Sequence, residues 1–405
     1  MTNILNDNQP VPIFSTMLPS LDDVYLQLND VWSTRQVTNN GTKLKLLEQE
    51  LQKILGVNHV SLINNGMIAL MLAVKALNLS GEVITTPFTF VATTQALSWN
   101  NIQPVFCDIN YYDMTIDVNK IEALITNKTT GILPVHVYGI PCNFNKIQNI
   151  ANKYHLKIIY DAAHAFCTKI NNIGIGNFGD ITMFSCHATK LFNTAEGGIL
   201  TCDNFELKQK INELRNFGIV DEETIDNIGL NGKLNEIQAA IGLENCKLIE
   251  QEWTKRKLLF DIYNKELEGI DGLYIFKLPS NVTNSLQYYP IRCIESVGNI
   301  SRDDVYLKLK KQNIFTRKYF YPLCSNFKCY KNLPSSLPSK LPVANKVASE
   351  ILCLPLHGAL KTDKVYTICK TIKSLIKGKN IKSSTNYISK LKSKKENKLI
   401  TEEYI

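Results

Sequence analysis

The stretches KIIYDAAHAF (residues 157–166) and ITMFSCHATK (residues 181–190) carry the strongest structural signal in the chain. Each begins with a short apolar run and then changes to polar residues, which is the pattern of a buried strand that ends at a loop. Asp161 ends the first run, Ser185 ends the second, and Lys190 follows in the loop. In a parallel sheet such residues collect at the carboxyl edge, where ligands bind. The two stretches therefore predict a functional site.

The segments around these stretches alternate between helix and strand patterns. Residues 43–55 (KLKLLEQELQKIL) have apolar residues at helical spacing with Gly56 as a stop, and residues 66–77 (GMIALMLAVKAL) have the pattern of a buried helix. A further helix is expected near 145–155, and further strands are expected in EVITTP (82–87), VFCDI (105–109) and TGILPVHVYG (130–139). Strands separated by helices predict βαβ units, and hence an α/β fold with a largely parallel sheet.

The pattern changes after about residue 245. One long or broken helix is expected at roughly 233–268, and shorter strands and turns follow it, with helices near 302–312 and 361–377. A chain of 405 residues has room for two or three domains. We predict a large domain over 1–250, a smaller C-terminal domain over 251–379, and a basic, flexible tail over 380–405.

Charge and cysteine usage exclude several classes of protein. Of the net charge of +8, residues 373–405 contribute +6, so the body of the chain is nearly neutral and neither nucleic acid nor a membrane is an expected partner. The eleven cysteines form no C-x-x-C pair, and the six histidines have no zinc-site spacing, which predicts reduced thiols and no metal. The polar start MTNILNDNQP lacks a signal-peptide pattern. We therefore expect a cytoplasmic protein.

Three features of the sequence together indicate the binding site of one cofactor, although each feature has a simpler explanation when it is taken alone. The helix start at Gly66 and Met67 is a natural phosphate cradle, but Gly66 is equally suited to a tight turn. Lys190 after a strand is suited to imine formation, but lysines are usually at the surface. Asp161 could instead cap a helix over AAHAF. Pyridoxal phosphate (PLP) needs a phosphate cradle, a lysine, and a carboxylate that keeps its ring nitrogen protonated.

The motifs DAAHAF and FSCHATKLFNTAEGG resemble those of the DegT/DnrJ/EryC1/StrS family of sugar aminotransferases. The likeness extends to about residue 375 and includes TNNG (38–41), TPFTFVAT (86–93), PVHVYG (134–139), NGKLNEIQAAIGL (231–243) and RKYFYPL (317–323). It implies the aspartate aminotransferase fold, called fold type I. In that fold a large mixed-sheet domain binds PLP, and a smaller α+β domain follows it.

The resemblance also implies roles by position. Lys190 corresponds to the catalytic lysine that forms the imine, and Asp161 to the partner of the ring nitrogen. Further cofactor contacts are implied for His164 at the phenolic oxygen or ring face, Phe90 stacked on the ring, Ser185 through its hydroxyl, and Gly66 and Met67 through their backbone amides. Asn231 corresponds to an asparagine that reaches the phosphate of the neighbouring subunit, which implies a homodimer with shared active sites.

Two positions depart from the family pattern. The glycine of the phosphate turn is usually followed by threonine, and here by Met67, so a hydroxyl contact is lost and we expect weaker cofactor binding. Cys186 stands where phenylalanine is usual. Candidate contacts for the sugar and nucleotide are Asn39, Asn40, His187, Arg317, Tyr319 and Tyr321. Packing within the protein is the alternative role for His187 and for the 317–323 segment.

The segment HATKLFNT followed by EGG resembles enzymes that aminate C4, and among them the viosamine-forming group. This implies transfer of an amino group from L-glutamate to a nucleotide-linked 4-keto-6-deoxyglucose, with pyridoxamine phosphate as the intermediate form of the cofactor. A 3-aminotransferase of a nucleotide-linked 3-keto-6-deoxyhexose is the alternative, and a non-catalytic PLP-fold regulator or binding protein is the alternative from a different class. The nucleotide stays open between dTDP, UDP and GDP.

Overall fold

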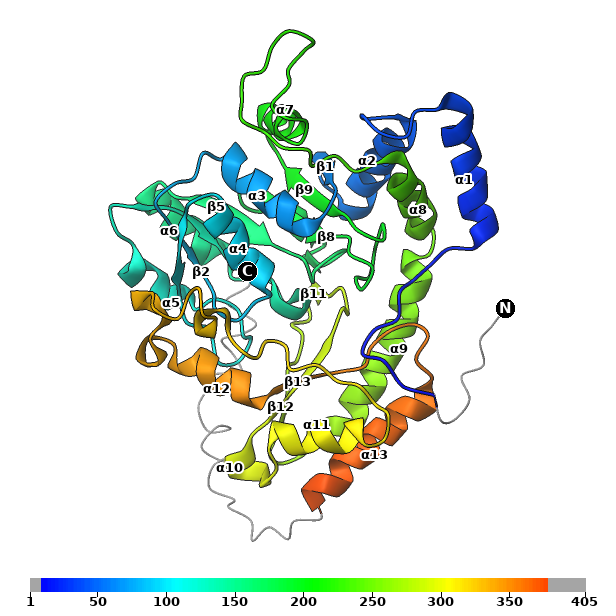
Figure 1. Cartoon of the computed structure of the whole chain (residues 1–405). Helices are drawn as coiled ribbons and strands as arrows, with labels where there is room; N and C mark the ends of the chain where they lie inside the picture. Colours follow the sequence, from blue (N-terminus) through cyan, green and yellow to red (C-terminus); the bar gives the residue numbers. More distant parts are fainter. Residues whose placement is uncertain (1–8, 378–405) are drawn as a thin grey trace.

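The computed structural model describes residues 9–377, and its centre is a seven-stranded sheet in the order β1-β9-β8-β5-β4-β2-β3 (Figure 1). The strands are β1 (His59–Ile63), β2 (Glu82–Thr85), β3 (Gln103–Phe106), β4 (Thr129–Leu133), β5 (Lys157–Asp161), β8 (Ile181–Ser185) and β9 (Gly198–Cys202). Strands β3, β2, β4, β5 and β8 run parallel, while β9 is antiparallel to both β8 and β1. The predicted α/β fold with a mixed sheet is confirmed.

Helices cover both faces of this sheet. The helices of this part of the chain are α1 (Leu21–Thr34), α2 (Thr42–Leu55), α3 (Gly66–Ala76), α4 (Val91–Trp99), α5 (Val118–Ile121), α6 (Phe144–Tyr154), α7 (Phe205–Leu214) and α8 (Glu236–Cys246). One core contains apolar residues of α2, α6 and α8, and the other contains those of α3, α4 and α7. The leucine stripe of α2 is buried, and the helix ends at Gly56, which takes the left-handed conformation at a φ of 64°. These local signals were all readable in the sequence.

A second, three-stranded sheet is built by the C-terminal part of the chain. Its order is β10 (Leu273–Ile275), β12 (Tyr289–Cys293) and β13 (Ile351–Leu354), all antiparallel. The helices of this part are α9 (Ile249–Leu267), α10 (Glu295–Gly298), α11 (Arg302–Lys310), α12 (Pro342–Glu350) and α13 (Thr362–Lys377). A small third sheet joins β6 (Lys169–Ile170) and β7 (Ile173–Gly174) to β11 (Val282–Thr283).

The expected helix at 233–268 is two helices, since α8 ends at Cys246 and α9 begins at Ile249. Figure 1 shows α9 running from the side of the large sheet towards the second sheet. Near the chain start, Val11 pairs with Ile314, so this segment packs with the C-terminal part. The domain boundary at residue 250 stays a prediction, and the predicted tail over 380–405 lies outside the described residues. Within residues 9–377, no helix has the length and apolarity to cross a membrane.

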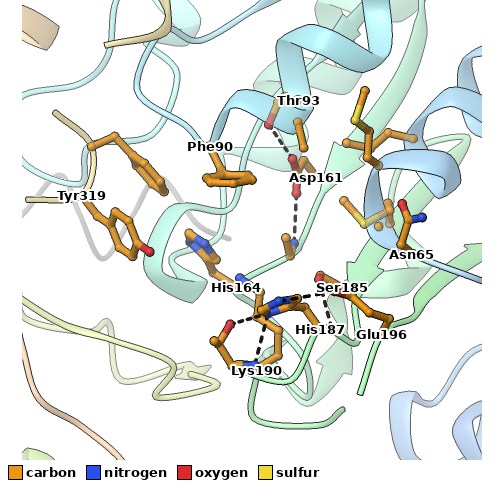
Figure 2. A pocket seen from close by; sticks show the side chains of 18 of the residues that line it. Asn65, Phe90, Thr93, Asp161, His164, Ser185, His187, Lys190, Glu196 and Tyr319 are labelled. Carbon is orange, nitrogen blue, oxygen red and sulfur yellow. Dashed lines mark hydrogen bonds and ion pairs between the residues drawn. The ribbon is translucent and has the colours of Figure 1, made fainter. Parts of the chain in front are cut away.

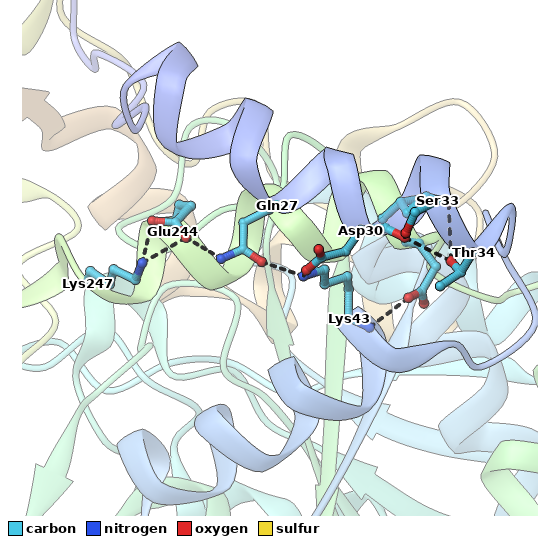
Figure 3. Close-up of polar contacts among 9 residues, drawn as sticks. Gln27, Asp30, Ser33, Thr34, Lys43, Glu244 and Lys247 are labelled. Atoms are coloured by element: carbon cyan, nitrogen blue, oxygen red, sulfur yellow. Dashed lines mark hydrogen bonds and ion pairs between the residues drawn. The ribbon is translucent and has the colours of Figure 1, made fainter.

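Helix α1 contacts the rest of the protein through polar groups (Figure 3). The Lys43 ammonium binds Asp30 Oδ2 at 2.6 Å and Gln27 Oε1 at 2.8 Å, and Gln27 Nε2 donates to Glu244 Oε1 at 2.6 Å. The large apolar side chains of the helix, among them Tyr25 and Trp32, are exposed instead. Val31 is the buried apolar residue of this helix, and much of its remaining apolar surface has no cover within residues 9–377.

Candidate active site

A cavity of about 570 Å³ opens where β5 and β8 end, between the large sheet and the C-terminal part (Figure 2). Ten of the residues singled out in the sequence line it: Gly66, Met67, Phe90, Asp161, His164, Ser185, His187, Lys190, Arg317 and Tyr319. Residues without a predicted role, including Asn65, Thr93, Glu196 and Tyr288, line it as well. The cavity therefore joins segments that are far apart in the chain, as expected for the carboxyl edge of a parallel sheet.

One end of the cavity is formed by the start of α3. The Asn65 side chain caps this helix by accepting a hydrogen bond from Ile68 N at 2.9 Å, which leaves the amides of Gly66 and Met67 as first-turn donors without a partner within the helix. A Cβ atom on Gly66 would stand 3.4 Å from Ser185 Oγ, so the glycine keeps open the space between the helix and the serine. Backbone donors, a helix dipole and a hydroxyl around one space suit a phosphate group.

Asp161 lies deeper in the cavity and is only 4% exposed. Its Oδ2 accepts a hydrogen bond from Thr93 Oγ1 at 2.7 Å, and its Oδ1 accepts one from Ala163 N at 3.0 Å. Burial raises the pKa of this carboxyl, while the two hydrogen bonds and the charge of Lys190 act in the opposite direction. No helix follows Asp161, because AAHAF forms turns, so the alternative role as a helix cap is not what the structure has.

Lys190 is held in the loop between β8 and β9. The loop closes as a narrow hairpin, with Cys186 N donating to Gly197 O and Ala188 N to Ala195 O. Leu191 and Phe192 are fully buried beside the lysine and anchor its backbone in the core. Burial lowers the pKa of Lys190 to about 8, and the Asp161 carboxylate opposes that shift. The lysine is thereby closer to its neutral, nucleophilic form at physiological pH than a free lysine is.

This pKa predicts how Lys190 reacts with an amine reagent such as acetic anhydride in the cofactor-free protein. We expect labelling of Lys190, followed by mass spectrometry, to rise with pH around a midpoint near 8, whereas an unperturbed lysine titrates near about 10.4. Because the folded pKa is the lower one, the unfolded chain binds the extra proton between these values, and stability contributed by this group rises with pH across that window. A labelling midpoint near that of a free lysine would contradict the prediction.

Aromatic rings form one wall of the cavity. The His164 ring lies parallel to the Phe320 ring at 5.7 Å and meets the Tyr288 ring edge-on at 4.8 Å. Its Nδ1 accepts a hydrogen bond from Tyr138 N at 3.3 Å, and burial together with the charge of Lys190 lowers its pKa. The imidazole is therefore neutral, with its proton on Nε2 facing away from that hydrogen bond. Phe90 projects towards the cavity from the start of α4 (Figure 2).

Polar groups stand near the opening of the cavity. His187 Nε2 lies 3.5 Å from Glu196 Oε1, and its Nδ1 lies 2.8 Å from Thr189 Oγ1. Arg317 comes from the C-terminal part, where its backbone pairs with Cys353 of β13, and its side chain lies against Tyr319. Arg317 thus adds a positive charge to a cavity that already contains Lys190.

Four predicted site residues lie outside this cavity. Asn39 and Asn40 precede α2 and line a separate cavity of about 150 Å³. Asn231 is exposed and pairs with Asn216 at the base of an extended arm, which is formed by residues 216–231. Tyr321 is exposed, and its ring packs on Arg302. Their contacts with substrate or cofactor stay predictions, and within one chain they do not reach the site.

The most informative residue that the sequence did not single out is Thr93. It lies on α4, and its hydroxyl binds the Asp161 carboxylate across 68 residues of sequence. Its only sequence signal is its place at the end of the TPFTFVAT motif.

Over residues 9–377, no group of three or more His, Cys, Asp or Glu side chains is arranged to hold a metal ion.

Known proteins resemble this chain over most of its length. The family model described as DegT/DnrJ/EryC1/StrS aminotransferase family matches residues 22–373. The dTDP-4-amino-4,6-dideoxy-D-glucose transaminase of Shigella dysenteriae is 43% identical over 366 residues, covering 90% of this chain and 99% of the relative. Its counterpart in Escherichia coli is 42% identical over 91% of this chain and 99% of the relative.

Solved structures of sugar aminotransferases share the fold. DesI, determined in the presence of its TDP-sugar product, superposes with a TM-score of 0.87 at 28% identity, over 91% of this chain and 94% of that one. Helicobacter pylori PseC, an aminotransferase involved in the biosynthesis of pseudoaminic acid, superposes with a TM-score of 0.82 at 27% identity, over 90% and 99% of the two chains. Together with the cavity and its lysine, these findings show that the chain belongs to the DegT/DnrJ/EryC1/StrS aminotransferase family.

Proposed function

We propose that this protein is a PLP-dependent aminotransferase that moves the amino group of L-glutamate to C4 of a nucleotide-linked 4-keto-6-deoxyglucose and so forms viosamine. The observation that carries the proposal is the cavity that holds both the partly buried Lys190 and the buried Asp161. The two transaminases at 43% and 42% identity support the choice of C4 and of dTDP as the nucleotide.

The residues of the cavity fit PLP. The α3 amides and the Ser185 hydroxyl suit its phosphate, Asp161 suits its ring nitrogen, and the rings of His164 and Phe90 suit the faces of a flat heterocycle. When bound, the cofactor supplies an electron sink that stabilises negative charge at the carbon losing its proton.

The protein's own residues then have separable tasks. Lys190, whose pKa is lowered to about 8, holds the cofactor and afterwards moves a proton as base and then acid. The Asp161 carboxylate keeps the ring nitrogen protonated, and Thr93 fixes the direction of that carboxylate. The aromatic wall excludes water, which strengthens these charge interactions. Arg317, with Lys190, supplies positive charge for anionic substrates.

The test is incubation of the protein with L-glutamate and dTDP-, UDP- or GDP-linked 4-keto-6-deoxyhexoses, followed by NMR of the product. We expect an equatorial amine at C4 of the dTDP sugar, as viosamine has, and one 2-oxoglutarate for each amine formed. An amine at C3 of a 3-keto substrate would favour the alternative position instead. The absence of amination with every substrate, by protein that has bound PLP, would refute the proposal.

Met67 offers a prediction about cofactor affinity. Met67→Thr restores a hydroxyl beside the α3 amides, and a hydrogen bond to a charged group stabilises by about 1.5–3 kcal/mol. We therefore expect the variant to bind PLP about tenfold more tightly, measured by absorbance titration of the cofactor-free protein. Met67→Leu is the control because it shortens the side chain without adding a hydroxyl. Equal affinities of the two variants would show that the position does not reach the phosphate.

We also propose that the active form is a homodimer in which Asn231 serves the partner's site. Support comes from exposed apolar side chains on α1, such as Tyr25 and Trp32, and on the 216–231 arm, such as Ile225 and Ile228. Contiguous exposed apolar surface marks interaction sites.

Free thiols at all eleven cysteines and the use of nucleotide sugars support a cytoplasmic location.

The dimer is tested by charge placed in its proposed interface. Ile225→Asp combined with Ile228→Asp should shift the protein from twice 45.8 kDa to the mass of one chain in sedimentation velocity, because two buried charges would lack partners. Leu337→Asp, at an exposed leucine far along the chain, is the matched control and should leave the mass unchanged. A double variant that sediments like the unaltered protein would place the interface elsewhere.

A further inference from the structure

Gln287 lies just before β12, in the C-terminal part of the chain, yet its side chain contacts the loop that carries Lys190. The side chain is buried, with 5% of the residue exposed. Its Oε1 accepts a hydrogen bond from Leu191 N at 2.7 Å, and its Nε2 donates one to Thr189 O at 2.8 Å. One amide group therefore holds the backbone on both sides of the lysine.

The geometry requires the chemistry of a primary amide. Only a side chain with a donor and an acceptor at its tip can pair with a backbone N–H and a backbone C=O together. A carboxylate would face Thr189 O with a second acceptor, and an apolar side chain would leave both buried backbone groups unpaired, which costs free energy. Glutamine at position 287 is therefore suited to pairing with both backbone groups, Leu191 N and Thr189 O.

The segment around Gln287 is itself fixed to the rest of the site. Ser285 Oγ donates to His164 O, and the Trp253 indole donates to Asn284 O at 2.9 Å. The ring of the next residue, Tyr288, lies 5.9 Å from Lys190 Nζ and packs edge-on against His164. Segment 284–288 therefore connects three parts: the turn after Asp161, the lysine loop and helix α9.

We propose that Gln287 is a positioning residue for Lys190, which holds the lysine backbone so that its amine stays in the cavity beside Asp161. The inference rests on the proposed function for its effect on turnover, but its structural content is independent of the substrate. The C-terminal part of the chain then sets the position of a lysine carried by the large sheet. A hydrogen-bond pair on the two residues flanking a reacting group limits its displacement, and small displacements cost large factors in rate.

The experiment compares three variants. Gln287→Met keeps the length of the side chain and removes both hydrogen bonds, and Gln287→Asn keeps the amide but is about 1.5 Å too short to reach both partners. Asn345→Leu is the matched control, because Asn345 is a half-buried amide on α12 that donates to Leu341 O at 2.8 Å and lines neither the cavity nor the lysine loop. The readouts are the pH midpoint of Lys190 acetylation in cofactor-free protein, and kcat and KM for glutamate.

In Gln287→Met we expect the labelling midpoint to rise by about one pH unit, because a released lysine is better hydrated. We expect kcat to fall about tenfold or more, with KM for glutamate within about twofold of the unaltered protein. Gln287→Asn should show the same changes in smaller size. It tests the role of Gln287 if the methionine variant does not fold. Asn345→Leu should lower the unfolding midpoint while its Lys190 midpoint and kcat stay at the unaltered values.

A labelling midpoint and kcat that stay unaltered in both Gln287 variants would overturn the proposal, as would changes of the same size in Asn345→Leu. The acetylation measurement needs neither cofactor nor substrate. If the unaltered protein transfers no amino group, the proposed function fails, and the acetylation midpoints still decide the role of Gln287.

Discussion

Replacing Lys190 by alanine should reduce turnover at least about 10⁴-fold, because in the proposed function the lysine is both the nucleophile that holds the cofactor and the base that moves the proton. The change should also abolish the covalent attachment of PLP, so that borohydride no longer fixes the cofactor to the protein. The rest of the cavity should still bind PLP without a covalent bond, since the α3 amides, Ser185 and Asp161 do not depend on the lysine. Both effects are measured directly, by product NMR and by mass spectrometry after reduction.

Two further variants distinguish the chemical role of the Lys190 amine from the effect of its positive charge. Lys190→Arg keeps the positive charge beside Asp161 but presents a guanidinium that stays protonated, so it should be as inactive as the alanine variant. Lys310→Ala, at a lysine on α11 outside the cavity, should retain full activity. Amination that depends on glutamate and survives in Lys190→Ala would remove the basis of the proposed function.

Replacing Asp161 by asparagine should lower kcat by about 10²–10³-fold, the range seen when one preorganised electrostatic partner is removed. The asparagine has the same shape and can keep the hydrogen bond from Ala163 N, and its amide can donate to Thr93 Oγ1, so the fold should persist. Only the negative charge is lost, and with it the proposed means of keeping the ring nitrogen of the cofactor protonated. The absorbance spectrum of bound PLP should change together with the rate.

Thr93→Val provides a graded comparison for Asp161→Asn. It removes one of the two hydrogen bonds that oppose the raised pKa of Asp161 and leaves the carboxylate in place. Its effect on kcat should therefore be about tenfold, below that of Asp161→Asn, because one hydrogen bond to a charged group is worth about 1.5–3 kcal/mol. The remaining hydrogen bond from Ala163 N keeps the carboxylate in place. Asp161→Asn with a rate within a few-fold of the unaltered protein would show that the carboxylate does not serve the ring nitrogen.

Much of the large sheet and its edge was predictable from the sequence. The runs that end at Asp161 and Ser185 are strands in the structure, and α3 begins at Gly66 as expected. These signals are local: a buried parallel strand needs a short apolar run, and a helix start needs a cap within a few residues. The break between α8 and α9 stayed open in the sequence, which predicted one long or broken helix, because no glycine or proline at Lys247 and Leu248 marks a helix end.

The sequence by itself determined which residue types are available for the chemistry and that Asp161, Ser185 and Lys190 end or follow strands of one sheet. Only the tertiary structure decided what surrounds them. Thr93 reaches Asp161 from 68 residues away, and Gln287 holds the Lys190 loop from 98 and 96 residues away. Periodicity and capping act over a few residues, whereas the pKa and the position of a lysine depend on every group packed around it. Those groups are chosen by how helices and sheets pack, which no local pattern specifies.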